Sequence, residues 1–107
     1  MKINNEKILN KPIRDVKWPN FIYMVEYFLE NELFCNTIGD VLNLTISEIE
    51  ERAKFEKNEV FGICKTLISL DSDLFYSSKL YDSLQNDKKY SKIIEKLNKP
   101  NEPTITI

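Results

Sequence analysis

The side chains of this chain that can do chemistry are carboxylates and lysines, because its 107 residues include no histidine and only two cysteines. Histidine is the commonest general acid or base, and its absence removes the usual partner of a serine or cysteine nucleophile. Carboxylate pairs such as Glu48 and Glu51 have the spacing of one helix face, which a solvated surface explains. No glycine-rich phosphate loop is present either, so the sequence predicts a protein without enzymatic activity.

The two cysteines, Cys35 and Cys64, are far apart in the sequence and each lies among apolar neighbours. No CxxC pair accompanies them, so we predict two buried, reduced thiols and expect neither a metal site nor a cofactor. The chain length suits a single domain over residues 1–107. No apolar run is long enough to cross a bilayer and the N-terminus lacks the apolar segment of a signal peptide, so we expect a cytoplasmic protein.

Charge is distributed unevenly along the chain, although the formal net charge is only −2. Residues 24–60 contain nine carboxylates and three basic side chains, an excess of six negative charges (nine minus three). Residues 1–17 and 79–99 are instead rich in lysine. A strongly acidic surface attracts basic partners and repels nucleic acid, so the middle of the chain predicts a binding site for a basic protein.

The expected partner-binding residues are acidic side chains of the first long helix and of a later turn, together with two tyrosines beside the apolar stripe of that helix. They are Glu26, Glu30, Glu32, Glu56, Glu59, Tyr23 and Tyr27. The helix dipole explains an acidic residue in the first turn of a helix, such as Glu59, but not the other four carboxylates. The tyrosines can alternatively shield the edge of the core.

Sequence patterns typical of helix starts and helix faces occur in the same part of the chain as these acidic and aromatic residues. Thr37 and Thr45 each precede an acidic residue three positions later, the capping-box pattern of a helix start. We predict helices over residues 20–32, 38–43, 46–53 and 59–70, with Phe34 closing the apolar stripe of the first and Asn58 capping the last. Apolar residues recur at helical spacing in that last helix, at Val60, Ile63, Cys64, Leu67 and Ile68. Residues 1–18 are predicted to be extended or loosely turned.

The expected fold is all-α: a compact bundle of short helices with a helix-hairpin-helix-like core and a C-terminal helical extension. The extension covers residues 75–99, where one helical pattern includes Tyr81 and Leu84 and a final one includes Ile93 and Leu97. Prolines interrupt residues 100–107, for which we predict a flexible tail that could alternatively add a strand to a partner's sheet.

The order of these motifs resembles the C-terminal domain of the bacterial RNA polymerase alpha subunit over residues 8–74. That family opens with L-x-x-P-I-E-E-L, which residues 8–16 (ILNKPIRDV) parallel, and continues with a helix. Its next motifs, N-T-V-G-D-L and L-T-E-E-E-L, are paralleled by residues 36–41 (NTIGDV) and 44–49 (LTISEI). The resemblance implies a helix-hairpin-helix fold, a link to transcription, and DNA contacts from the first helix and from a Gly-Lys-Lys-Ser hairpin.

The DNA-contact positions of that family are altered here. The hairpin corresponds to residues 56–59 (EKNE), where two carboxylates would repel phosphate, and residues 20–32 contain no Lys or Arg. We therefore favour a protein-binding module, either an immunity or antitoxin protein that masks a cationic nuclease toxin or a small transcription-linked adaptor. The alternative is a DNA-binding transcription regulator, which would use Lys57, Asn58, Lys88, Lys89 and Lys92.

Overall fold

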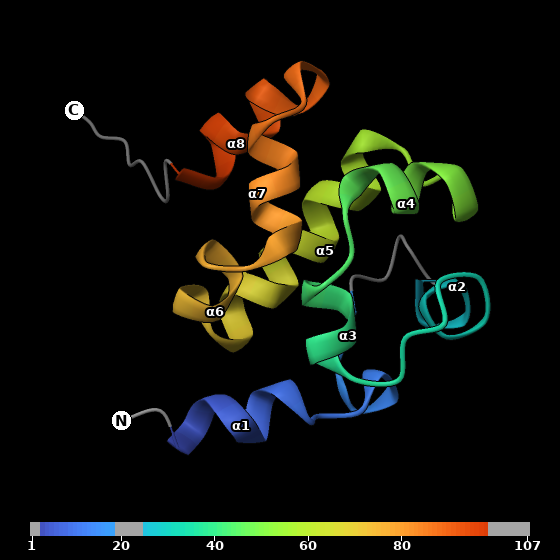
Figure 1. Ribbon diagram of the computed structural model, residues 1–107, viewed down its shortest axis with the longest axis vertical. Helices are drawn as coiled ribbons and strands as arrows, with labels where there is room; N and C mark the ends of the chain where they lie inside the picture. Colours follow the sequence, from blue (N-terminus) through green and yellow to red (C-terminus); the bar gives the residue numbers. More distant parts are fainter. Residues whose placement is uncertain (1–2, 19–24, 99–107) are drawn as a thin grey trace.

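The computed structural model describes residues 3–18 and 25–98, and within these ranges the chain is all-helical, as expected (Figure 1). Eight α-helices and two short 3₁₀ helices follow one another in the described ranges. They are α1 (Ile3–Leu9), η1 (Ile13–Asp15), α2 (Val25–Asn31), α3 (Ile38–Leu42), α4 (Ile46–Arg52), α5 (Lys57–Leu70), α6 (Ser72–Tyr76), α7 (Lys79–Gln85), η3 (Lys88–Tyr90) and α8 (Ser91–Asn98). None of these helices is long and apolar enough to cross a membrane.

The two predicted capping boxes are confirmed. The amide of Asp40 donates to Thr37 Oγ1 at 3.3 Å, and the amide of Thr37 donates to Asp40 Oδ2 at 3.2 Å. The same reciprocal pair starts α4, where the distances between Thr45 and Glu48 are 3.3 and 2.9 Å. Both acidic side chains therefore hold helix starts by satisfying amides that a helix leaves without an internal partner.

Helix α5 begins two residues earlier than the sequence indicated, so the predicted cap at Asn58 is wrong. Its N-cap is Glu56, whose backbone is extended, and Lys57 is its first helical residue. The carboxylate of Glu59 accepts a hydrogen bond from the Glu56 amide at 2.7 Å. An acidic side chain at the third position thus caps this helix start without help from a hydroxyl at the cap. Residues 57–59 consequently form the first turn of a helix, and residues 53–56 form the connection from α4.

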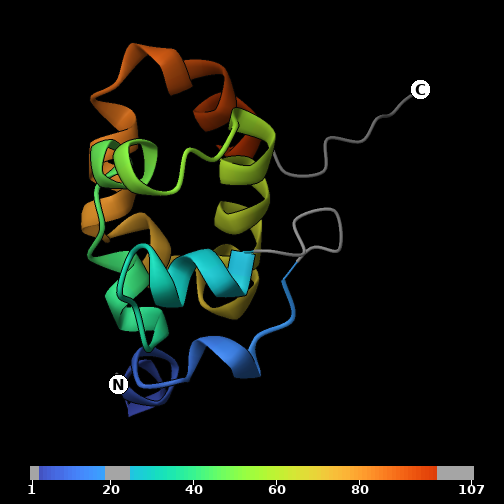
Figure 2. The same ribbon diagram turned by 90° about the vertical axis from the view of Figure 1, so that its right-hand side faces the viewer.

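The N-terminal segment is helical, contrary to the expectation of an extended stretch. Figure 2 shows α1 next to α3 at one end of the molecule, with α8 at the opposite end. The amide of Ile13 donates to the Asn36 carbonyl and the amide of Ile38 donates to the Lys11 carbonyl, both at 3.0 Å. A Cβ at Gly39 would lie 3.0 Å from the carbonyl oxygen at the end of α1. This close docking stabilises the N-terminal helices, and no local sequence pattern in residues 3–18 predicts it.

One apolar core joins the described helices, and α5 contributes a continuous stripe to it. The predicted positions Val60, Ile63, Cys64 and Leu67 are all buried. The C-terminal extension belongs to the same core, through side chains such as Phe75, Leu80, Leu84 and Tyr90. The single helical pattern expected after Leu74 is divided into α6 and α7, because the Ser78 hydroxyl accepts from the Tyr81 amide at 3.1 Å and starts a new helix.

Candidate functional site

An exposed aromatic side chain follows α2. Phe34 is 70% exposed and its φ is +56°, in the left-handed region that bulky residues rarely adopt. Its neighbours Leu33 and Cys35 are 5% and 1% exposed. The expectation that Phe34 closes the apolar stripe is therefore wrong. With the backbone left-handed at this position, the two flanking side chains both lie in the core while the ring faces solvent.

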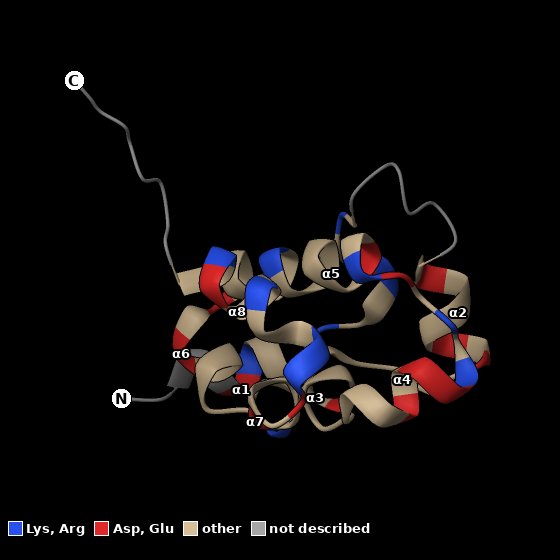
Figure 3. Cartoon of the chain, turned by 90° about the horizontal axis from the view of Figure 1, so that it is seen from above, with Lys and Arg blue, Asp and Glu red and all other residues tan. Residues whose placement is uncertain are grey.

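Aromatic contacts connect this end of α2 to the segment before α5. The Arg52 guanidinium lies 5.7 Å from the centroid of the Phe34 ring, within reach of a cation–π interaction. Phe28 meets the ring of Tyr27 edge-on at 5.5 Å and the ring of Phe55 edge-on at 5.7 Å. Figure 3 shows acidic segments on both α2 and α4, at the same end of the molecule.

Two of the predicted acidic partner-binding residues are occupied by contacts within the chain. Arg14 binds Glu30 through two hydrogen bonds, Nη2 to Oε1 at 3.1 Å and Nε to Oε2 at 3.2 Å. The hydrogen bond to Glu30 and the charge of that carboxylate raise the pKa of Arg14. Glu59 is held by its role at the start of α5. Neither carboxylate is as available to a partner as the sequence suggested.

The other described partner-binding residues lie on α2 (Glu26 and Tyr27), directly after it (Glu32) and at the N-cap of α5 (Glu56). Glu26 and Glu32 are half-buried, Tyr27 is 49% exposed and Glu56 is exposed. Tyr23 lies outside the described residues. We call the set of Glu26, Tyr27, Glu32, Phe34 and Glu56 the acidic–aromatic surface. Its acidic members and Tyr27 were predicted from the sequence, whereas Phe34 was not. The sequence signal that could have identified Phe34 is its position between Leu33 and Cys35, which are both buried in the core.

A basic groove lies between the first turns of α5 and the C-terminal helices. Four of the five residues proposed for nucleic-acid contact line it: Lys57, Asn58, Lys89 and Lys92. The remaining lining residues are Phe61, Ile93 and Lys96, and the groove has a volume of about 260 Å³. The ammonium groups of Lys96 and Lys65 lie 5.6 and 5.9 Å from the centroid of the Phe61 ring. The fifth residue, Lys88, lines a different pocket.

A buried phenol fixes one wall of the basic groove. Tyr90 donates a hydrogen bond from its hydroxyl to Glu50 Oε2 at 2.8 Å, and Lys89 Nζ lies 2.9 Å from the same oxygen. The hydrogen bond from Lys89 is the main reason that the pKa of Glu50 is lowered. Burial is the main reason that the pKa of Tyr90 is raised. The charge of Lys89 is therefore largely balanced within the chain.

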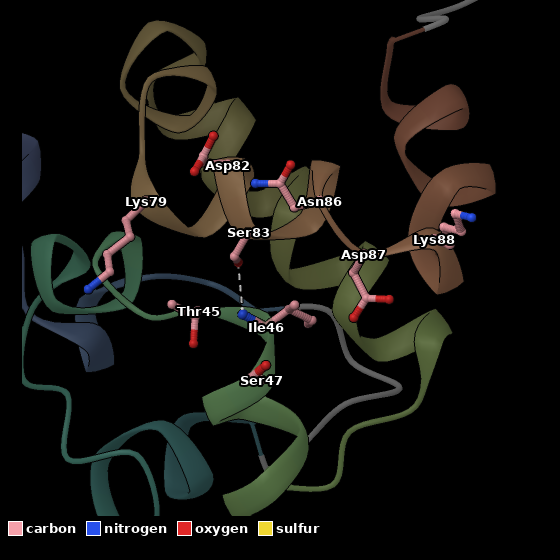
Figure 4. Close-up of a pocket in the computed structure, with 9 residues that line it drawn as sticks. All are labelled: Thr45, Ile46, Ser47, Lys79, Asp82, Ser83, Asn86, Asp87 and Lys88. Carbon is pink, nitrogen blue, oxygen red and sulfur yellow. Dashed lines mark hydrogen bonds between the residues drawn. The ribbon is translucent and has the colours of Figure 1, made fainter.

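A polar pocket of about 500 Å³ is lined by residues from the start of α4 and from α7 (Figure 4). Its nine lining residues include two aspartates and two lysines; Figure 4 shows the lysines, Lys79 and Lys88, on opposite sides of it. The Ser83 hydroxyl accepts a hydrogen bond from the Ile46 amide at 2.8 Å and donates one to the Leu80 carbonyl at 2.8 Å. Because this hydroxyl satisfies an amide at the start of α4, the contact fastens α7 to α4.

The cysteines carry no reactive thiolate. Cys35 and Cys64 are both buried and form no disulfide, as the sequence predicted. Burial raises the pKa of each thiol from 9.0 to about 12. A neutral thiol is a poor nucleophile and a poor metal ligand. Among the described residues, no cluster of three or more His, Cys, Asp or Glu side chains is placed to hold a metal ion.

Comparisons with protein-family models, with curated proteins and with solved structures found no match. The resemblance to the C-terminal domain of the polymerase alpha subunit therefore stays a prediction.

Proposed function

We propose that this chain is a non-enzymatic protein-binding module whose acidic–aromatic surface binds a basic protein. The observation that supports the proposal most directly is the state of Phe34. A left-handed backbone costs a residue with a side chain about 1–2 kcal/mol, and this chain uses it to hold a ring that is 70% exposed. Lys54, which follows α4, has the same φ of +56°, and helices commonly end on a left-handed residue, so the exposed ring and not the backbone alone supports a binding role.

The chemistry of the surface suits a partner rich in arginine and lysine. Aromatic side chains are enriched at the centres of protein interfaces, and the rings of Phe34 and Tyr27 offer faces on which a guanidinium can stack. Arg52 already occupies such a position against Phe34. Glu26 lies on α2, Glu32 follows it and Glu56 precedes α5, and these carboxylates would steer a cationic surface toward the two segments and pair with it.

Two kinds of partner fit this chemistry. One is a cationic nuclease toxin that the chain would neutralise as an immunity protein or antitoxin. The other is a basic component of the transcription apparatus that the chain would contact as a small adaptor. The gene context would decide between them, because an immunity protein or antitoxin is encoded beside its toxin.

The proposal is tested by affinity capture from native lysate with the wild-type chain and two matched charge reversals. Glu32→Lys changes the acidic–aromatic surface, and Glu95→Lys makes the same change at an exposed position of α8. We expect the wild type and Glu95→Lys to capture the same basic protein, identified by mass spectrometry. Glu32→Lys and Phe34→Ala should both lose it. Equal capture by all four proteins would show that this surface is not the binding site.

The alternative of a DNA-binding regulator is favoured by one observation, the convergence of Lys57, Asn58, Lys89 and Lys92 on one groove. It is disfavoured by the ion pair that balances Lys89 and by two carboxylates at the start of α5, Glu56 at the N-cap and Glu59 in the first turn. A gel-shift series with an AT-rich duplex separates the two functions. The protein-binding proposal expects no shift at low salt, whereas a shift that weakens steeply with salt would support the regulator.

A further inference from the structure

We propose that the basic groove is a second binding site, and that it takes an acidic peptide segment carrying one apolar side chain. This inference goes beyond the proposed function, because the groove contains different residues from the acidic–aromatic surface and has the opposite charge. The chain would then connect a basic partner and an acidic one. The apolar side chain would lie against Phe61 and Ile93, and the carboxylates would meet Lys57, Lys92 and Lys96.

The groove combines an apolar floor with a cationic rim. Phe61 comes from α5 and Ile93 from α8, while the lysines project from the first turn of α5 and from two successive turns of α8. Its volume of about 260 Å³ is below the range of pockets that enclose a drug-sized molecule. A space of this size accepts a single large side chain from an extended segment.

The lysines of the rim attract an anion because most of their charge is not balanced locally. Within the described residues, Lys89 is paired with Glu50, but Lys57, Lys92 and Lys96 form no ion pair. Lys96 and Lys65 instead lie near the Phe61 ring, which stabilises a cation only weakly at an exposed site. Bringing carboxylates to these ammonium groups relieves the mutual repulsion of the lysines.

The surroundings of the groove favour a peptide over nucleic acid. A duplex carries one charge about every 1.7 Å and needs a continuous basic track. Here Glu56 and Glu59 interrupt that track beside Asn58. A short segment with a few local carboxylates needs no continuous basic track.

The test measures fluorescence polarisation of a fluorescein-labelled peptide of about ten residues, in which glutamates flank a Phe-Leu pair, at about 0.15 M salt. The full chain is compared with Lys92→Glu and with Lys79→Glu, an equal charge reversal at an exposed residue of α7. We expect wild type and Lys79→Glu to bind the peptide, and Lys92→Glu to lose at least about tenfold in affinity. Lys92→Ala, which removes one exposed charge without adding another, should lose affinity in the same direction.

Three results would overturn the inference. Equal losses in Lys92→Glu and Lys79→Glu would show general attraction to the protein and no groove site. Equal affinity for a peptide with Ser-Ser in place of Phe-Leu would show that the apolar floor is not used. Stronger competition by an AT-rich duplex or a single-stranded oligonucleotide would assign the groove to nucleic acid. Phe34→Ala should bind the peptide normally, so failure here is distinguishable from failure of the proposed function.

Discussion

Replacing Phe34 by alanine and by glycine tests the left-handed backbone that holds the exposed ring. The buried part of the ring, given 70% exposure, is about 60 Å² and contributes about 1.5 kcal/mol to stability. The contact with Arg52 adds about 0.5 kcal/mol. Both variants lose these two contributions to the free energy of unfolding. Only glycine also relieves the left-handed conformation, which stabilises it against alanine by about 1 kcal/mol.

We therefore expect Phe34→Ala to lower the free energy of unfolding by about 2 kcal/mol and Phe34→Gly by about 1 kcal/mol. In thermal unfolding, the glycine variant should melt about 4 °C above the alanine variant. Urea unfolding followed by circular dichroism measures the difference directly. An alanine variant as stable as the glycine variant would refute the reasoning, because alanine is the more stable residue wherever φ is ordinary. Both variants should lose the basic partner equally.

Three further predictions concern Tyr90, the two cysteines and Gly39. Tyr90→Phe removes the 2.8 Å hydrogen bond to Glu50 and should lower the free energy of unfolding by about 1–2 kcal/mol. Most of this loss should be absent when Glu50 is already replaced by alanine, which a double-mutant cycle in urea would measure. Because burial raises the pKa of Cys35 and Cys64 from 9.0 to about 12, both thiols should resist Ellman's reagent at about pH 8 until urea unfolds the chain. The stability that their neutral forms contribute is complete below pH 9.0 and is lost as the pH rises toward 12, so an unfolding midpoint constant across that range would contradict the assignment. Gly39→Ala should not raise the free energy of unfolding by the usual amount of about 1 kcal/mol from helix propensity, because its Cβ would lie 3.0 Å from a carbonyl oxygen of α1. A raised urea midpoint would show that α1 is not docked there.

Local signals in the sequence were sufficient for most of the helices. The starts of α3 and α4 follow from Thr37 and Thr45, because a cap joins residues only three positions apart. The buried face of α5 follows from its apolar spacing. The start of α5 was misplaced because Glu59 caps it without the hydroxyl that the usual pattern includes. The N-terminal helices were missed because their stabilisation comes from docking against α3.

The charged surfaces were predicted less completely than the helices. Composition located the acidic middle of the chain, and the sequence placed Glu59 in the first turn of a helix, but neither could reveal that Arg14 neutralises Glu30. It also could not separate Lys88 from Lys89, which are adjacent in sequence and line different pockets. Whether two charged side chains form an ion pair depends on which helices lie side by side. The spacing of residues within one segment does not contain that information.

The sequence by itself determined that this chain is a bundle of short helices with an acidic middle and basic ends, because capping and periodicity act within a few residues. Only the tertiary structure decided that Phe34 faces solvent and that lysines from α5 and α8 form one groove around Phe61. The physical reason is that the core selects which side chains it buries. Leu33 and Cys35 occupy it, and the ring between them is left outside.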